Sequence, residues 1–357
     1  MPELRKNPVT KEWVIVATER GQRPKDFGAV SEDPGLRNEF EEKCPFCTGN
    51  EGMTPPEVLA YRRSGRKDGP GWWVRVVPNK YPALAIEGDL DRKGYGMYDR
   101  MNGVGAHEVI VETPLHNKCI AMIAPHEAEE VIWAYRERYM DLRKDSRFKY
   151  ILIFRNHGKA AGASLAHPHS QLIAVPFVPS LIRLELMGAR DYHLYRERCI
   201  YCDMIQQEVQ YGKRVVSENE RFVAFEPFAP QFAFETWILP KRHNPHFENE
   251  DRDGVRLFAQ ILQGTLLTIG KTLNYPPYNY TLHTAPFELG PDQVFHWHLQ
   301  IMPRLAIAAG FEMGTGIYIN TVPPEDAAEY LRAAAQPPGA PAPIEPEGQP
   351  AETTVQK

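Results

Sequence analysis

The sequence has no run of 18 apolar residues, so no segment predicts a membrane-spanning helix. Its first residues, MPELRKNPVTKEW, lack the apolar stretch of a secretory signal. An excess of basic charge is missing too, because 41 Lys and Arg stand against 46 Asp and Glu in 357 residues. Non-specific binding to nucleic acid requires a basic surface. We therefore expect a cytoplasmic protein that binds neither a membrane nor nucleic acid.

Cysteine is scarce, and the count of five is odd. Four of these residues form two Cys-x-x-Cys pairs, Cys44/Cys47 and Cys199/Cys202, while Cys119 stands alone. In a chain long enough to need no disulfides, such pairs indicate metal ligands in a reducing compartment. A redox site is the alternative, but it requires a thioredoxin-like βαβ context that the sequence does not suggest.

The composition is that of a globular protein, with 43% apolar and 24% charged residues, and the length suggests about two domains. Helical periodicity predicts a helix over 126–144 with Ile132, Tyr135, Tyr139 and Leu142 on one face. Residues 336–357 contain six prolines and almost no large apolar side chain, so we expect a disordered tail. Strands are expected at 13–18, 107–113, 149–156, 232–240, 278–284 and 294–303, and further helices at 180–198, 249–272 and 324–335.

The chain contains an internal repeat. The segment His167-Pro-His169-Ser-Gln171 is matched by His296-Trp-His298-Leu-Gln300 in the second half. Each segment is preceded in the chain by a Cys-x-x-Cys pair. Between the pair and the segment lies a further histidine, His116 or His243, just after a strand and a proline turn. Two such units indicate gene duplication. We expect two related halves, 1–180 and 181–335, followed by the tail 336–357.

The first of these segments has the character of a phosphate site. On a strand, His167, His169 and Gln171 would point to one face. The preceding loop, 156–166, is rich in small residues that let backbone N–H groups approach a phosphate, and Ser164 adds a hydroxyl. The alternative is that these polar side chains only form hydrogen bonds with backbone groups of the loop. The small-residue loop beside them makes this alternative the weaker interpretation.

The paired cysteines predict zinc sites. Zinc takes four ligands in a tetrahedron, and a Cys-x-x-Cys pair supplies two of them from one turn. Four protein ligands leave no open position, so we expect two zinc ions per chain with structural roles. The ligand sets are Cys44, Cys47, His116 and His167 for the first site and, by the repeat, Cys199, Cys202, His243 and His296 for the second.

If His167 holds a metal, His169 remains free on the same strand. A neutral imidazole is nucleophilic, and a phosphoramidate formed on it is labile enough to pass the phosphoryl-linked group on. His169 is therefore predicted to be a nucleophile in a two-step transfer. A general base or a purely structural histidine are the alternatives.

Together these motifs resemble the galactose-1-phosphate uridylyltransferase family, a branch of the histidine-triad superfamily, over roughly residues 4–332. The resemblance implies an α+β, histidine-triad-like duplicated fold whose two related halves share a mostly antiparallel sheet flanked by helices. The matching segments are the opening Arg5…Pro8…Trp13…Arg20-Gly-Gln-Arg23-Pro24, CPFCTGNE (44–51), VPNKYPAL (77–84), the 156–171 loop and GFEMGTG (310–316).

The resemblance also implies roles for single residues. His169 would carry the nucleotidyl group, with Gln171 and Ser164 holding phosphate oxygens. Lys159, Arg20 and Arg23 would offset the negative charge of the phosphates. Phe311 and Glu312 would bind the sugar across the interface of a homodimer. The full set of implied substrate-binding residues is Arg20, Arg23, Asn79, Lys80, Tyr81, Asn156, Gly162, Ser170, Phe311 and Glu312.

The reaction implied is ping-pong transfer from UDP-glucose to galactose 1-phosphate, giving glucose 1-phosphate and UDP-galactose through a uridylyl-His169 intermediate. Three features resemble the ADP-glucose phosphorylase branch instead. They are Ser170, where many members have glycine, the second Cys-x-x-Cys pair and the segment 276–287. Adenylyl transfer from ADP-glucose to phosphate is thus the alternative. A different class would be a non-catalytic, zinc-containing nucleotide-binding module.

The second metal site has an alternative as well. Many family members bind their second metal with a carboxylate and three histidines, and iron would suit that set. His296 belongs to both sets, so the two cannot coexist as full sites, and we favour the cysteine set because soft thiolates suit zinc. The alternative ligands are Glu185, His283, His296 and His298.

Overall fold

The computed structural model describes residues 1–17, 19, 23–27, 31–289 and 294–335. Arg20 and the expected tail 336–357 lie outside the described residues. The centre of the molecule is a ten-stranded sheet in which every neighbouring pair is antiparallel. In order across the sheet, the strands are β10 (Val215–Glu218), β11 (Phe222–Phe225), β12 (Thr236–Pro240), β14 (His298–Pro303), β13 (Tyr278–His283), β8 (Tyr150–His157), β9 (His169–Val175), β7 (Ala106–Val111), β4 (Trp72–Pro78) and β3 (Leu59–Arg62).

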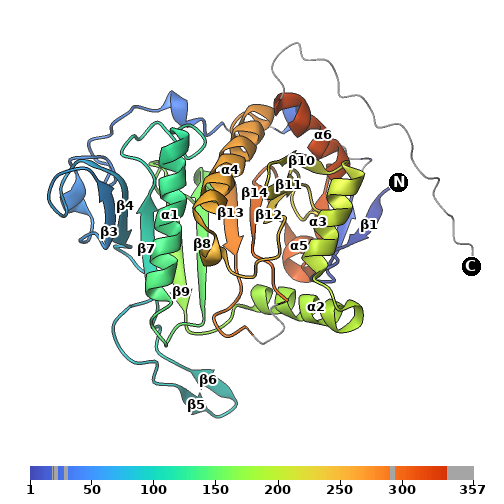
Figure 1. The fold of residues 1–357 in the computed structure, drawn as a ribbon, viewed down its shortest axis with the longest axis horizontal. Helices are drawn as coiled ribbons and strands as arrows, with labels where there is room; N and C mark the ends of the chain where they lie inside the picture. Colours follow the sequence, from blue (N-terminus) through green and yellow to red (C-terminus); the bar gives the residue numbers. More distant parts are fainter. Residues whose placement is uncertain (18, 20–22, 28–30, 290–293, 336–357) are drawn as a thin grey trace, which may run out of the picture.

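The order of the strands repeats about the centre of the sheet (Figure 1). Read inwards from one edge, five strands of the first half come in the order β3, β4, β7, β9 and β8. Read inwards from the other edge, five strands of the second half come in the order β10, β11, β12, β14 and β13. The halves meet where β8 pairs with β13, so the chain builds one continuous sheet.

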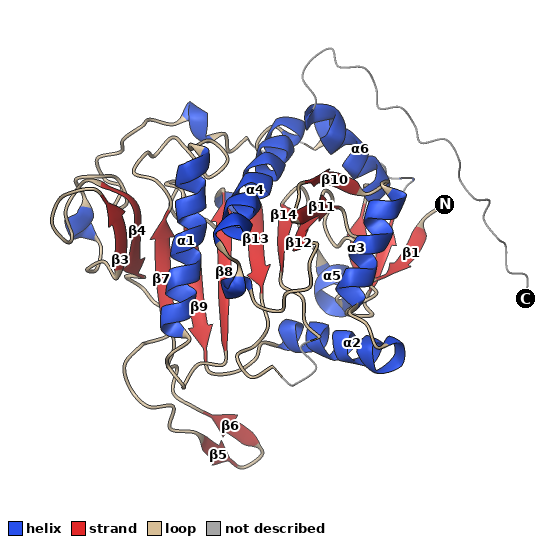
Figure 2. Cartoon of the chain, in the orientation of Figure 1, coloured by secondary structure: helices blue, strands red, loops and turns tan. Residues whose placement is uncertain are grey.

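Helices cover both faces of the sheet, but unequally (Figure 2). On one face, α1 (Pro125–Leu142) and α4 (Arg252–Leu273) pack against each other and the sheet, and α6 (Pro324–Ala335) packs on α4. On the other face, α2 (Ser180–Arg196) and α3 (Ile200–Tyr211) bury Val223, Phe225, Trp237 and Leu239 of the second half. The corresponding face of the first half carries turns and loops, and His169 lies there.

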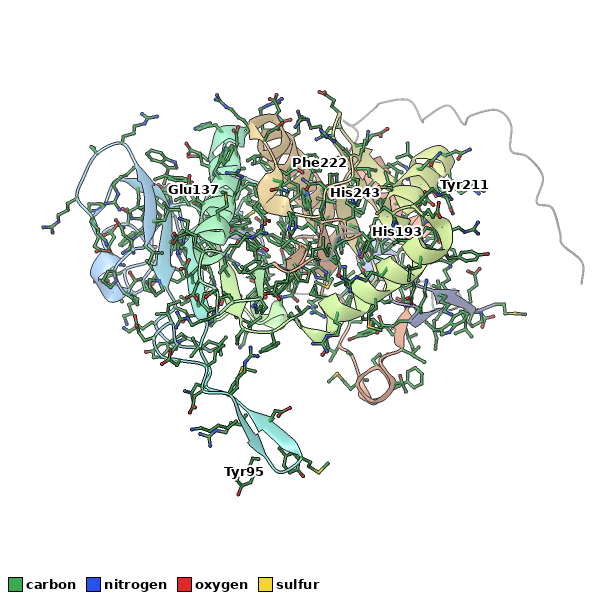
Figure 3. The ribbon with its side chains drawn as sticks, turned by 60° about the horizontal axis from the view of Figure 1, so that its bottom comes forward. Tyr95, Glu137, His193, Tyr211, Phe222 and His243 are labelled. Atoms are coloured by element: carbon green, nitrogen blue, oxygen red, sulfur yellow. The ribbon has the colours of Figure 1, made fainter. Side chains whose placement is uncertain are left out.

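Two smaller sheets lie outside this core. Strands β1 (Glu3–Lys6) and β2 (Trp13–Val16) pair with β15 (Tyr318–Asn320), which follows the short helix α5 (Gly310–Thr315). The hairpin of β5 (Lys93–Tyr95) and β6 (Tyr98–Arg100) projects from the body, with Tyr95 near its tip (Figure 3).

The expected α+β class, with a mostly antiparallel sheet flanked by helices, is confirmed. The predicted face of the 126–144 helix is buried in α1, where Ile132, Tyr135 and Tyr139 have no exposed surface and Leu142 has 7%. The sequence reading missed α3 and four strands of the sheet, β3, β4, β10 and β11. Among the described residues, no helix is long and apolar enough to cross a membrane.

Candidate active site and metal sites

His169 is the first residue of β9, at the centre of the sheet, with only 6% of its surface exposed. Its Nδ1–H donates to the backbone carbonyl of His167 at 2.8 Å, which leaves the lone pair on Nε2. Burial lowers the pKa of His169, so the ring is neutral at pH 7. The side chain thus has the protonation state and the free nitrogen that a nucleophile needs.

Phe46 fixes the other side of this ring. It stands between Cys44 and Cys47, and its ring centroid lies 5.3 Å from that of His169 and 6.1 Å from that of His167. The turn that presents the two cysteines therefore also packs against the candidate nucleophile. The sequence reading did not single out Phe46, because only the cysteines of that turn carry an evident chemical signal.

Gln171 lies two residues further along β9, on the same face as His169. Its Oε1 is 2.8 Å from Nε2 of His107, and the same nitrogen is 3.1 Å from Nδ2 of Asn79. Asn79 accepts in turn from the backbone N–H of Tyr81 at 2.9 Å. The structure thus brings Gln171 and Asn79 together, whereas Lys80 and Tyr81 extend into solvent.

The small-residue loop follows β8 and passes through the turn Lys159–Ala161. Gly162 has a φ of 88°, a left-handed conformation that side chains disfavour, and Ser164 is exposed at the loop surface. Asn279 of β13 donates to Asn156 Oδ1 at 2.7 Å and to the carbonyl of Ala161 at 2.8 Å. The second half of the chain therefore supports the loop of the first half, through a residue that the sequence reading missed.

Ser170 points away from this face. Its side chain has no exposed surface and bonds with Glu112, Tyr135 and Tyr280 on the side of the sheet that α1 and α4 cover. The strand alternation that places His169 and Gln171 together sends Ser170 to the opposite face. The substrate contact expected of Ser170 is therefore corrected, since its hydroxyl is enclosed in the core.

The first predicted zinc ligands converge. Ligating atoms of Cys44, Cys47, His116 and His167 all lie within 4.8 Å of one another, and all four residues are buried. Nδ1 of His116 and Nδ1 of His167 are each 3.6 Å from Sγ of Cys47. Tetrahedral zinc at ordinary bond lengths separates sulfur and nitrogen ligands by about 3.6 Å. The donor set and its spacing fit zinc.

The second cysteine set repeats this arrangement. Cys199, Cys202, His243 and His296 converge within the same limit, and Nδ1 of His243 and of His296 are each 3.6 Å from Sγ of Cys202. His167 donates from Nε2 to the carbonyl of Thr113, and His296 donates from Nε2 to the carbonyl of Pro240, both at 2.8 Å. These bonds turn Nδ1 of each ring toward the cysteines. His243 lies at the protein surface, so this set is more open than the first (Figure 3).

The alternative second metal set is divided in the structure. Glu185, His283 and His298 form a separate buried group, whereas Nδ1 of His296 faces the cysteines. Glu185 holds Nδ1 of His283 at 3.0 Å. His298, the counterpart of His169, has no exposed surface and stacks on Trp237.

The remaining predicted substrate residues lie on exposed segments or on α5. Arg23 is exposed at the start of the turn Pro24–Asp26, and Lys159 is exposed in the phosphate loop. Phe311 and Glu312 belong to α5, which contacts β15 and lies in the half away from β9 (Figure 1). Arg37 was missed by the sequence reading. It donates to the carbonyl of Ala166 at 2.7 Å, just before His167.

The fold and these sites define a mixed α+β protein with two cysteine–histidine clusters and a buried histidine on β9. A family model described as galactose-1-phosphate uridyl transferase, N-terminal domain, matches residues 1–179, and a model of a domain of unknown function matches 116–336. The chain belongs to the galactose-1-phosphate uridyl transferase family and is an enzyme, a nucleotidyltransferase.

Two curated relatives and one solved structure show how far the likeness extends. The chain is 38% identical to an ADP-glucose phosphorylase of Arabidopsis thaliana, over 93% of this chain and 92% of the relative. It is 31% identical to a galactose-1-phosphate uridylyltransferase of Thermotoga maritima, over 93% and 98%. The crystal structure of an ADP-glucose phosphorylase from Arabidopsis thaliana with bound ADP-glucose superposes with a TM-score of 0.79, at 36% identity, and covers 93% of this chain and 98% of that one.

Proposed function

We propose that this enzyme transfers a nucleotidyl group from a nucleotide sugar through a covalent intermediate on His169. The observation that carries the proposal is the state of the His169 ring. Its Nδ1–H is held by the His167 carbonyl and its pKa is lowered by burial, so Nε2 offers a lone pair at neutral pH. Gln171 shares a strand face with His169, the small-residue loop precedes it in the chain, and both would supply donors for the phosphate oxygens.

The transfer takes two steps. Nε2 of His169 attacks the α-phosphorus of the nucleotide sugar, a P–N bond forms, and the bond to the leaving hexose 1-phosphate breaks. A second phosphate group then attacks the same phosphorus, and the bond to His169 breaks. The histidine returns to its starting state, so no oxidant or further reactant is needed.

For the substrates, we propose ADP-glucose as the donor and inorganic phosphate as the acceptor, giving ADP and glucose 1-phosphate. The 38% identity to the plant ADP-glucose phosphorylase and the second cysteine pair support this choice. Transfer from UDP-glucose to galactose 1-phosphate is the second candidate, which the sequence alone favoured. The relative of Thermotoga maritima and the segment with Phe311 and Glu312 support it.

We also propose that two zinc ions per chain bind the two cysteine–histidine sets and act structurally. The matching geometry of the sets supports two sites of one kind. Zinc in the first set would link the turn that contains Phe46 to His167, two residues before His169. It would thereby fix the position of the His169 ring, which Phe46 contacts. A homodimer remains part of the proposal, since α5 must come from a second copy if Phe311 and Glu312 are to reach the sugar.

The halves 1–180 and 181–335 are proposed to descend from one duplicated unit. The mirrored strand order and the repeated histidine bonds support this origin. Only the first half has the small-residue loop before its histidines, so one catalytic histidine per chain is expected.

The test is a labelling experiment. The protein is incubated with ADP-glucose or UDP-glucose labelled at the α-phosphate, and an acid-labile, base-stable protein adduct is sought. An adduct from ADP-glucose alone supports the first candidate, and one from UDP-glucose alone supports the second. Absence of an adduct with either sugar, or an adduct that persists in His169→Ala, overturns the covalent mechanism.

A further inference from the structure

His107 lies on β7, beside the strand that carries His169. In the pairing of β7 with β9, Val109 is opposite Gln171, and His107 is opposite Ile173. Side chains two residues apart on a strand share a face, so His107 stands diagonally across from Gln171. A histidine at a strand end is more often structural than functional, although the sequence also allows His107 to contact a phosphate.

The contacts of His107 define which ring nitrogen carries its proton. The backbone N–H of Ala83 points at Nδ1 from 3.2 Å, and a backbone amide can only donate. Nδ1 must therefore hold a lone pair, and a neutral ring carries its proton on Nε2. The proton on Nε2 is then donated to Gln171 Oε1 at 2.8 Å, and Asn79 Nδ2, which lies 3.1 Å from Nε2 and is also a donor, makes no hydrogen bond to Nε2 in this tautomer.

A held carbonyl oxygen fixes the orientation of the whole Gln171 amide. Because Oε1 is bound to His107, the NH2 group is the end that remains for a ligand. An NH2 group donates, as a phosphate oxygen requires, whereas a flipped amide would present its own oxygen and repel the phosphate.

The second half of the chain has no histidine at the corresponding position, and its glutamine also bonds to Glu185. Gln300 is the counterpart of Gln171, and Glu235, just before β12, comes two residues before the residue paired with Gln300, as His107 does for Gln171. The carboxyl oxygens of Glu235 accept from Trp237 and from backbone N–H groups. Gln300 turns its NH2 group onto Nε2 of His298 at 3.1 Å and so occupies that lone pair. Among the described residues, Gln171 makes no such bond to His169.

We infer that His107 is a positioning residue, which directs the Gln171 NH2 group to the phosphate and keeps it off the His169 lone pair. The inference rests on the proposed function. It also links two parts of the site, because Asn79 and Ala83, which surround His107, belong to the segment expected to hold the nucleotide base.

The experiment compares four single variants and one double variant by the rate of adduct formation from the α-labelled nucleotide sugar. His107→Leu removes the donor, His107→Gln restores an NH2 group at similar reach, and His126→Leu alters an exposed histidine as the control. We expect His107→Leu to slow the adduct step on the order of 10-fold or more, with partial recovery in His107→Gln. Gln171→Ala should slow it similarly, and His107→Leu added to Gln171→Ala should cost nothing further. A wild-type rate in His107→Leu, or losses that multiply in the double variant, overturns the inference.

A second measurement does not depend on activity. Nitrogen NMR shifts of His107 in the wild-type protein should report the Nε2–H form of the ring, and an Nδ1–H ring overturns the inference. Absence of any adduct in the wild-type protein overturns the proposed function instead, so the two proposals fail separately.

Discussion

Arg155 and Glu112 form an ion pair behind β9, with 1% and 0% of their surfaces exposed. Glu112 also accepts from the Ser170 hydroxyl, and Tyr135 reaches both Ser170 and Tyr280, the latter at 2.6 Å. The strand that presents His169 is therefore anchored from the opposite side by charged and polar groups that have no access to water.

Removing one partner of this ion pair should be costly. We predict that Arg155→Met lowers the free energy of unfolding by about 3–5 kcal/mol, because Glu112 is left as an uncompensated buried charge. Lys144→Met, which breaks the exposed pair with Asp141, is the control and should change it by less than about 1 kcal/mol. Urea unfolding measures both, and equal effects would contradict the distinction drawn here.

Acid should destabilise the protein through His157, whose ring stacks on Tyr278 and donates to the carbonyl of Glu32 at 3.1 Å. Burial, with help from Arg155, lowers the pKa of His157 to about 3. Below the unfolded-chain pKa of about 6.5, the unfolded chain binds a proton that the folded protein excludes. The free energy of unfolding should then fall by up to about 1.4 kcal/mol per pH unit, between pH 6.5 and 3.

The matched variant for this pH effect is His157→Gln, which cannot bind the proton. Its unfolding free energy, measured in urea between pH 7 and 5, should fall less steeply than that of the wild-type protein. The other buried histidines contribute equally to both proteins, so parallel slopes would show that His157 is not the group responsible.

Among the elements, α2 is held close to the N-terminal segment by a glycine. A Cβ at Gly188 would lie 1.9 Å from the carbonyl oxygen of Val9, closer than any real contact. In α4, the interior position Gly264 is exposed and a Cβ there would meet no atom within 4 Å. The two glycines therefore differ in packing although both lie inside helices.

We predict opposite effects of alanine at these positions. Gly264→Ala should raise the free energy of unfolding by up to about 1 kcal/mol, because alanine favours the helix. Gly188→Ala should lower it by about 1–3 kcal/mol, because the methyl group forces α2 away from Val9. Thermal unfolding of both variants gives the comparison, and a stabilising Gly188→Ala would contradict the observed packing.

Across the whole molecule, the two cysteine sets lie in different halves and share no ligand. We predict two zinc ions per chain in the purified protein, one in Cys47→Ser and one in Cys202→Ser. Cys119→Ser, which alters the buried cysteine outside both sets, should retain two. Elemental analysis measures these values, and a full complement in either ligand variant would contradict the assignment.

Much of this arrangement follows from local sequence. The spacing of His167, His169 and Gln171 predicts which side chains share a strand face, and the same alternation already directs Ser170 to the other side. The partners of these residues come from remote parts of the chain. Glu112 meets Arg155 and Asn279 meets Asn156 through the pairing of strands, and Phe46 meets His169 because a remote turn packs on β9. No local pattern encodes these contacts.

The pairing of β8 with β13 has a consequence for any attempt to divide the protein. Residues 1–179 expressed alone would leave β8 as an edge strand, paired with β9 on one side and with the backbone N–H and C=O groups of its other side open to another chain. The same cut would remove Asn279 from the phosphate loop. Neither half is therefore expected to be self-sufficient, and the fragment that carries the proposed nucleophile is expected to aggregate rather than to act as a smaller enzyme.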